Sequence, residues 1–277
     1  MKYQVILPLR FKYDFGAPVW RLRPDTVANR LALEVRDADL LIAHFYTLDC
    51  ATYTLQEIKL PQQLTWWQGL EDAHQGKVYI HGYADRQLGQ HKGILALEAT
   101  TGKPAWESTG LAFYGIVAAG ILAYPATELE ADYTLLDAAS GKTMESGISQ
   151  LQATAAVNDF GRQRYSLCQY PVLYKEGETY FEQVRDFLNA MEFEAGPVQA
   201  LEYAETENCF IISFYIASGK DKLKNILLVY DLAGEFLLQE TLGCGLSGIG
   251  SDTFFIFGAD LYFIQNRDIL KAYQLLT

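Results

Sequence analysis

The sequence contains little of what usually marks a metal knuckle, a membrane span or an export signal. Its cysteines lie far apart and form no CxxC pair, which excludes a zinc knuckle or a redox motif of that type. No run of about 18 apolar residues occurs, so we expect no transmembrane helix and no membrane partner. The N-terminal stretch MKYQVILPLRFKYDF is too short in apolar residues for a signal peptide. These absences predict a cytoplasmic protein.

The sequence is also poor in positive charge. Lysine and arginine number 22 against 34 aspartate and glutamate residues, which gives a net charge of −12. Such a chain repels a phosphate backbone unless its basic residues gather in one stripe, and none is found. The densest basic run, SGKDKLKN, is typical of a solvated turn between strands. We therefore expect no nucleic-acid partner.

Aromatic and apolar residues, in contrast, are abundant. The chain holds 18 Tyr, 15 Phe and 4 Trp, and 50% of its residues are hydrophobic. Residues of these kinds fit the pleated, half-buried surface of a sheet. With 277 residues the chain can bury a sizeable core, and all-β architectures of this size often form one domain. We expect a single all-β domain over residues 1–277.

One phrase recurs along the chain and indicates how that domain is built. Each copy contains an apolar run, an acid or its near neighbour, a glycine turn and a second short strand. The copies are GILALEATTGKPAWES at 93–108, YTLLDAASGKTMES at 133–146 and NILLVYDLAGEFLLQE at 225–240. The repeated acid positions are Asp49, Glu98, Asp137 and Asp231. They lie roughly 40 to 50 residues apart, except that the last interval is about twice as long and so hides one unit.

A period of this length with several short strands per unit is the signature of a β-propeller. The second unit predicts strands at 64–72, 77–84, 93–99 and 104–108. The third predicts strands at 111–117, 120–125, 133–138 and 142–146, and the fifth at 198–205, 209–217, 225–231 and 235–240. We therefore predict a six-bladed β-propeller, with seven blades if residues 1–24 contribute more than one strand.

The two ends of the chain are expected to complete one blade together. The last unit supplies three strands, and the segment APVWRLR at 17–23 resembles the outer strand at 104–108, with Trp20 corresponding to Trp106. An unclosed ring would leave sheet edges with unpaired N–H and C=O groups. We predict that this N-terminal strand closes the last blade.

Residues 150–195 interrupt the repeat. The apolar residues of ETYFEQVRDFLNAM recur at helical spacing, which predicts one inserted helix near 178–191. Gly196 and Pro197 follow it and favour a stop before the next strand. The helix either fills a gap in the ring or carries part of the function, because insertions on regular scaffolds often do.

The stretch ALEATTGKPAW, which ends at Trp106, resembles the quinoprotein-type (PQQ-like) β-propeller repeat, and LLDAASGK at 135–142 repeats most of it without the tryptophan. The resemblance implies glycines in tight hairpin turns and a tryptophan that packs on the neighbouring blade. No ligand of the quinone enzymes maps onto this sequence, so we expect no cofactor. In length and in its lone helix, the chain is similar to uncharacterised bacterial β-propeller proteins, a resemblance that implies no activity.

The longest predicted loop between second and third strands is 84–93, and such loops rim one face of a propeller near its channel. His81, Asp85, Arg86 and His91 lie in or just before it. Two imidazoles, an acid and a guanidinium suit a metal, an anion or acid–base chemistry. The histidine spacing matches no standard metal motif, so the identity of any metal stays unknown. The alternative interpretation is an exposed polar loop.

Two other polar clusters are further candidates for a site at the channel mouth. The first is the mixed-charge cluster of Asp159, Arg162 and Arg164 in NDFGRQRY. The second is the acidic segment TELEAD, with Glu128, Glu130 and Asp132, which suits calcium only if its acids converge, because calcium takes six to eight oxygens. The remaining histidines, His44 and His74, are expected to be surface or packed residues.

The sequence leaves two classes of function open. It is rich in blade-packing residues and poor in catalytic motifs, which favours a non-enzymatic binding or interaction scaffold for an unknown protein or small-molecule ligand. The alternative is a metal-dependent hydrolase or lyase at the channel mouth, with acids of 128–132 and His81 or His91 as metal ligand or base. Whether the protein is an enzyme is not decided by these residues.

Overall fold

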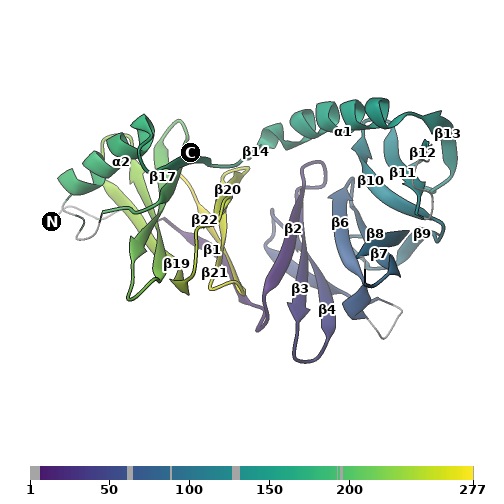
Figure 1. Cartoon of the computed structure of the whole chain (residues 1–277), viewed down its shortest axis with the longest axis horizontal. Coiled ribbons are helices and arrows are strands. Elements are labelled where there is room, and N and C mark those ends of the chain that lie inside the picture. The colour runs from purple at the N-terminus through teal and green to yellow at the C-terminus, as the bar shows by residue number, and fades with distance from the viewer. Residues whose placement is uncertain are drawn as a thin grey trace. The chain divides into compact units, whose positions relative to one another are not determined.

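The computed structural model describes residues 7–60, 65–87, 89–126, 132–191, 193 and 196–276. The described residues form five antiparallel sheets and two α-helices (Figure 1). They divide into two compact units, one of residues Ala17–Leu167 and one of residues Met1–Gly16 together with Cys168–Thr277. The structure is thus predominantly β, in sheets of four or five strands. Neither described helix is long and apolar enough to cross a membrane.

The unit Ala17–Leu167 holds three sheets, each made of four strands that follow one another in sequence. The first contains β2 (Val19–Asp25), β3 (Arg30–Asp37), β4 (Ile42–Asp49) and β5 (Thr54–Ile58). The second contains β6 (Gly69–His74), β7 (Lys77–Asp85), β8 (Gln90–Glu98) and β9 (Pro104–Ser108). The third contains β10 (Leu111–Val117), β11 (Gly120–Pro125), β12 (Tyr133–Leu136) and β13 (Thr143–Ile148). The strands predicted for the second and third repeat units are confirmed, although β6 begins later than expected.

Two of the recurring acids, Asp49 and Asp137, lie at or just after the end of the third strand of their sheets and cap the following turn. The Asp49 carboxylate accepts the backbone N–H groups of Ala51 and Thr52, each at 3.0 Å. Asp137 accepts the N–H of Ser140 at 2.8 Å, and the Ser140 contacts lower the pKa of this carboxyl. A short acidic side chain is favoured at such a turn because it satisfies backbone donors that the turn leaves free.

Trp106 and Gly141 explain why the repeat carries a tryptophan and a glycine. Trp106 on β9 packs against Ile116, Ile121 and Leu136 of the third sheet, and its Nε1–H donates to the Ala138 carbonyl at 3.0 Å. Gly141 has φ +68°, and a Cβ there would lie 2.6 Å from ring atoms of Trp106. The packing role predicted for the tryptophan is therefore confirmed, and the glycine serves both the turn and the close approach.

The buried carboxylate of Asp25 joins the first and second sheets. Asp25, which is 1% exposed, accepts hydrogen bonds from the N–H groups of Val27 and Ala28 in its own hairpin. It also accepts from Gln75 and Gly76 in the hairpin that follows β6. One side chain thus satisfies the backbone of two adjacent sheets, which fixes how these sheets lie against each other.

The first strand of each of these three sheets carries a β-bulge. In β6, Leu70 pairs with Ile80 and Asp72 with Tyr79, so that Glu71 is an extra residue. The same irregularity leaves Trp20 as the extra residue of β2 and Tyr114 as that of β10. A bulge re-aims the side chain of its extra residue relative to the regular pleat. The bulges form a structural repeat that the sequence does not display.

The helix α1 (Gln150–Arg164) was not predicted. It begins with a capping box in which Ser149 and Gln152 exchange side-chain and backbone contacts. The helix lies beside β10 (Figure 1), where Val157 fits over Gly115: a Cβ at position 115 would lie 2.7 Å from Val157 Cγ2. The sequence of α1 is rich in Gln and Ala and lacks a clear apolar stripe, so its periodicity gave no signal.

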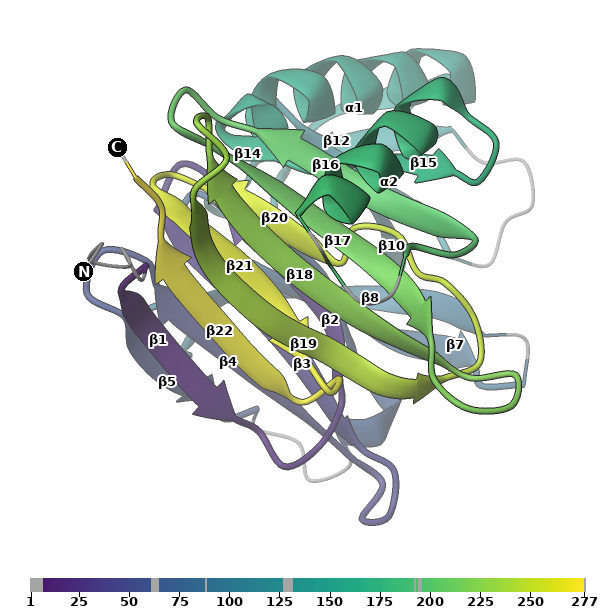
Figure 2. The ribbon, with the colours of Figure 1, turned by 90° about the vertical axis from the view of Figure 1, so that its left-hand side faces the viewer.

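The second unit holds two five-stranded sheets. One contains β15 (Val172–Lys175), β16 (Ala200–Glu205), β17 (Cys209–Ala217), β18 (Leu223–Asp231) and β19 (Phe236–Leu246). The other has the order β1 (Leu9–Asp14), β22 (Ile269–Gln274), β21 (Asp260–Gln265), β20 (Phe254–Phe257) and β14 (Cys168–Gln169). The predicted helix is confirmed as α2 (Thr179–Ala190), which lies beside the first of these sheets (Figure 2). Its Phe181 and Leu188 pack in one core with side chains of that sheet.

Two expectations about the ring need correction. The strand beside β22 is β1, which pairs with it antiparallel (Figure 2), whereas residues 17–23 form most of β2 in another sheet. Trp20 lies on a bulge and is 61% exposed, unlike the packed Trp106. The segment expected to hide a whole unit contains α1, β14, β15 and α2 instead, so the described residues form five sheets.

Candidate functional site

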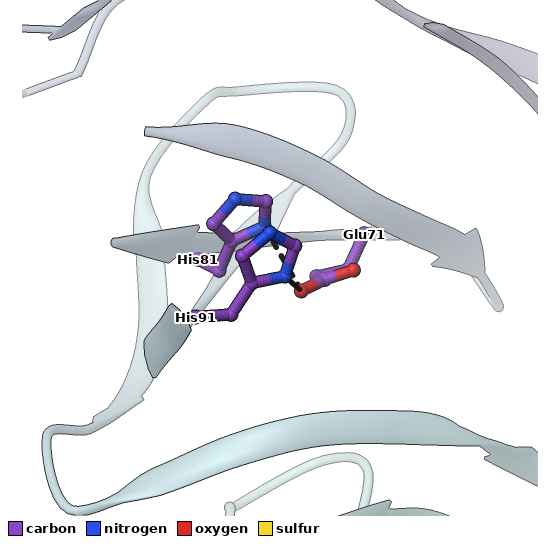
Figure 3. Close-up of side chains that lie close together, drawn as sticks. All are labelled: Glu71, His81 and His91. Atoms are coloured by element: carbon purple, nitrogen blue, oxygen red, sulfur yellow. Dashed lines mark hydrogen bonds and ion pairs between the residues drawn. The ribbon is translucent and has the colours of Figure 1, made fainter. Parts of the chain in front are cut away.

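Glu71, His81 and His91 converge at one end of the second sheet (Figure 3). Nδ1 of His81 lies 2.9 Å, and Nδ1 of His91 2.8 Å, from Oε1 of Glu71. The two imidazole rings stack, with centroids 3.5 Å apart and planes at 13°. One ligand atom from each residue lies within 4.8 Å of the others. Imidazole nitrogens with a carboxylate oxygen form a donor set that zinc and related transition metals prefer.

Local strand geometry brings these three side chains together. In the hairpin of β7 and β8, Tyr83 pairs with His91, and His81 lies two residues before Tyr83. Alternation along a strand therefore places His81 and His91 on the same face of the sheet. Glu71 is the extra residue of the β6 bulge, between the pairs that Leu70 and Asp72 make with β7. The bulge is what directs the carboxylate of Glu71 toward the histidines.

His81 is the buried member of the cluster. Its side chain is 2% exposed. Nδ1 faces the Glu71 carboxylate at 2.9 Å, whereas Nε2 has no hydrogen-bond partner among the residues that the structure describes. Burial lowers the pKa of His81, although Glu71 opposes this shift. At neutral pH the ring is thus uncharged, which is the form of histidine that binds metal ions.

Glu71 carries the negative charge of the cluster. Burial raises the pKa of Glu71, but the contacts with His81 and His91 outweigh it and lower that pKa to about 2. The guanidinium of Arg21 adds a longer contact of 3.8 Å to the second carboxylate oxygen. Tyr83 packs edge-on against both imidazoles, at centroid distances of 5.2 and 5.3 Å. The carboxylate is therefore ionised at neutral pH, and the rings are held from the side.

A cavity of about 700 Å³ lies on the same sheet. Its lining includes Trp67, Tyr83, Arg86, Lys92 and Glu107. His81 also contributes to the lining, whereas Glu71 and His91 do not, so the cavity and the cluster are neighbouring but distinct features. A volume of this size suits a small ligand.

The structure separates the predicted residues 81–91 by role. His81 and His91 come together, and Arg86 lines the cavity. Asp85 instead caps a turn, where its carboxylate accepts the N–H of Gln87 at 2.7 Å. The predicted loop 84–93 is mostly strand, because β7 extends to Asp85 and β8 begins at Gln90.

The predicted cluster of Asp159, Arg162 and Arg164 is also divided. Asp159 and Arg162 form an exposed ion pair one turn apart on α1. Arg164, with a side chain 3% exposed, makes two hydrogen bonds of 2.7 Å to the carboxylate of Asp72 and another to the Ala73 carbonyl. Arg164 thus anchors the end of α1 to β6, and its expected place at a channel mouth is wrong because its charge is buried.

The other candidates that the structure describes take no part in the cluster. Glu128 and Glu130 lie outside the described residues, and Asp132 is exposed. His74 is buried, with its ring 5.5 Å from that of Phe160 between centroids. Nδ1 of His44 lies 3.1 Å from Oε1 of Glu57 near the surface. These two histidines are packed and surface residues, as predicted.

Glu71 is the member of this cluster that the sequence did not indicate. It occurs in the strand GLEDAH, where nothing in the spacing relates it to His81 or His91. Only the bulge on β6 brings it into contact, and a bulge depends on the register between strands. A further hint is Gly69, which pairs with His81 and leaves room for the ring.

Comparisons with known proteins add a family match and weak structural likenesses. The family described as a domain of unknown function (DUF4905) matches residues 25–106, a range that includes Glu71, His81 and His91. No curated protein matches the chain.

Among solved structures, the chain is similar to the β-propeller domain of the Trilobed protease from Pyrococcus furiosus, at 10% identity, with 94% of this chain and 82% of that chain covered and a TM-score of 0.34. It is similar to the Dos1 propeller at 8% identity, with 97% and 95% covered and a TM-score of 0.41. It is similar to Saccharomyces cerevisiae Sqt1 at 7% identity, with 99% and 100% covered and a TM-score of 0.30. Likenesses this weak show no shared activity or ligand.

Proposed function

We propose that the protein is a β-propeller binding protein that holds a divalent transition-metal ion, with Zn²⁺ as the leading candidate, on Glu71, His81 and His91. The propeller assignment is supported by the three consecutive four-stranded antiparallel sheets of residues Ala17–Leu167 and by the pairing of β1 with β22. Propellers are built from such small sheets, which need neighbours to bury both faces.

The observation that carries the metal assignment is the state of His81. Its ring is buried, its Nε2 has no hydrogen-bond partner within the described chain, and it stacks on a second imidazole beside an ionised carboxylate. Burying a polar nitrogen without a partner is costly, by roughly 1 to 3 kcal/mol. A divalent ion gives one ring nitrogen of His81 a partner and uses the charge of Glu71.

The ligand set also favours a second candidate function, a metal-dependent hydrolase or lyase. Structural zinc sites take four protein ligands, whereas catalytic sites take three and keep a position for water or substrate. The described residues supply three ligands here. The side chain of His91 is 31% exposed, so the cluster is open to solvent on that side. In the binding scaffold, the same position holds a ligand or a side chain of a partner.

A metal titration with matched variants tests the proposal. Tag-free protein is stripped with a chelator and titrated with Zn²⁺ and Co²⁺ by calorimetry, and the stoichiometry is checked by elemental analysis. We expect one ion per chain, and Glu71→Gln or His91→Ala should weaken binding by at least about tenfold. His44→Ala is the control, because this histidine also contacts a glutamate but lies outside the cluster.

Two results would overturn the metal assignment. One is the lack of stoichiometric binding by folded wild-type protein. The other is equal affinity of wild type, Glu71→Gln and His91→Ala. Circular dichroism of each variant shows whether a loss of affinity reflects a lost ligand or a lost fold. A variant that keeps the wild-type spectrum and loses the ion supports the assignment.

A further inference from the structure

We propose that the cavity beside the second sheet is a binding site for a small molecule that bears a carboxylate or phosphate group, with Arg86 and Lys92 as the residues that meet its charge. The inference goes beyond the metal site and does not depend on it, because Glu71 and His91 do not line this cavity. It rests on the charge of the residues that line the cavity, on the packing of Arg86 and on the glycines of the lining.

The charge of the cavity wall is opposite to that of the chain. The protein carries a net charge of −12, yet the charged residues that line the cavity are Arg86, Lys92 and Glu107, apart from the titratable His81 and Tyr83. Two cations against one acid make this wall a local site of positive potential, which attracts anions. Glu107 lies on β9 and disfavours a second negative group on the same ligand near it.

The two cations are not committed elsewhere. Neither Arg86 nor Lys92 forms an ion pair with any residue in the described part of the chain. Other arginines of the same unit are held by carboxylates: Arg36 contacts Glu34, and Arg164 contacts Asp72. A cation without an ion-pair partner in a cavity is available to a ligand at no cost of breaking an internal pair.

Aromatic packing holds Arg86 in place. Its guanidinium lies over the Trp67 ring, 4.8 Å from the centroid. Trp67 in turn meets Tyr83 edge-on, with centroids 5.9 Å apart. A guanidinium stacked on an indole keeps its N–H edges free for bidentate hydrogen bonds to a carboxylate or phosphate. Because this stacking already restricts the side chain, binding loses less conformational entropy.

Two glycines contribute to the lining of the cavity. Gly82 and Gly93 belong to the lining, and Gly93 has φ +86°. A Cβ at Gly82 would lie 3.2 Å from the Lys92 carbonyl oxygen, so a side chain here would crowd the strand that carries Lys92. Glycine leaves space for a ligand to approach the backbone closely.

Titration of metal-free protein with two named anions tests the inference. Inorganic phosphate and acetate are added separately, and binding is followed by calorimetry and by tryptophan fluorescence, since Trp67 lines the site. We expect saturable binding of at least one anion, weakened at least about tenfold in Arg86→Gln and in Lys92→Gln, as for loss of a charge-assisted contact. The anion that binds more tightly identifies the source of the charge.

Lys103→Gln is the matched control, because Lys103 lies in the exposed turn that follows β8 and not in the cavity lining. This variant should bind as the wild type does. The inference is overturned if neither anion binds folded wild-type protein, or if Arg86→Gln and Lys92→Gln both bind like wild type. Metal binding is measured separately with Glu71→Gln. Loss of the anion proposal therefore does not affect the test of the metal proposal, and the reverse is also true.

Discussion

The imidazole of His81 lies directly against the backbone of Gly69. A Cβ built on Gly69 would be 2.5 Å from Cε1 and 2.8 Å from Nε2 of His81, closer than real side chains approach. Gly69 pairs with His81 across β6 and β7, so the strand register sets the ring beside this glycine. The position of the buried ring therefore depends on the lack of a side chain at residue 69.

Gly69→Ala should displace His81 and weaken metal binding by at least about tenfold, because the added methyl group occupies the place of the ring. The overpacking should also lower the free energy of unfolding by about 1 to 3 kcal/mol. Zinc titration and urea denaturation measure the two effects. Gly110→Ala is the control, because nothing lies within 4 Å of a Cβ at that position. Unchanged metal affinity in Gly69→Ala would contradict the assigned role of His81.

Arg164→Met should destabilise the protein by about 3 to 5 kcal/mol, because it leaves the Asp72 carboxylate without its buried partner. The double variant Arg164→Met with Asp72→Asn should recover part of this loss. Arg162→Ala removes an exposed ion pair from the same helix and should cost less than about 1 kcal/mol. Chemical denaturation compares the three proteins, and equal effects of Arg162 and Arg164 would contradict the anchoring role.

Gly141→Ala should destabilise the protein more than Gly147→Ala does. Both glycines have positive φ, +68° and +80°, so both substitutions impose backbone strain of about 1 to 2 kcal/mol. Only at Gly141 would the new Cβ meet the Trp106 ring, which adds an overpacking cost of about 1 to 3 kcal/mol. Thermal and urea unfolding measure the difference. A Trp106→Leu background should reduce it, since the smaller side chain gives way.

His74 should make stability depend on pH. Burial lowers the pKa of His74, and the charge of Arg164 acts in the same direction, whereas Asp25 and Asp72 oppose it. The folded state thus favours the neutral ring: its stability contribution is present above the ordinary histidine pKa and is lost as the pH falls through the lowered folded-state pKa. For one proton the slope is at most about 1.4 kcal/mol per pH unit.

Urea unfolding of wild type and His74→Gln between about pH 7.5 and pH 5 checks this prediction, since the ordinary histidine pKa lies inside that window. The wild type should lose more stability on acidification than His74→Gln. Lys103→Gln, an exposed change in the same unit, should keep the wild-type slope. Parallel curves for wild type and His74→Gln would show that burial of His74 does not set the slope.

Local signals explain which parts of the fold were predictable. Strands such as β10 and β17 were predicted at their observed bounds, because apolar runs and glycine turns are properties of short segments. The helix α2 was predicted from its apolar stripe. The repeat period, however, assigned a hidden blade to a length of chain that forms α1, α2 and two short strands. The repeat period gives the length of the segment between two repeats, but it does not determine whether that segment forms strands or helices.

The candidate site was half predictable for a related reason. His81 and His91 lie on one hairpin, so the sequence could suggest them together. Glu71 joins them only through a bulge, which arises from pairing between strands and not from the residues of β6 alone. For Arg164 the sequence was misleading, because its charged neighbours in the sequence, Asp159 and Arg162, are exposed. Arg164 is buried instead through its contact with Asp72, which is remote in the chain.

The bulges of β2, β6 and β10 place tryptophan, glutamate and tyrosine at one equivalent backbone position in three successive sheets. Because the extra residue stands outside the ladder of paired neighbours, its side chain can be exchanged while the hydrogen bonds on both sides persist. A single substitution at this bulge position can therefore change the chemistry of one sheet without affecting the other two. The same property makes residues 20, 71 and 114 suitable positions at which a carboxylate or an imidazole can be introduced by design without changing the fold.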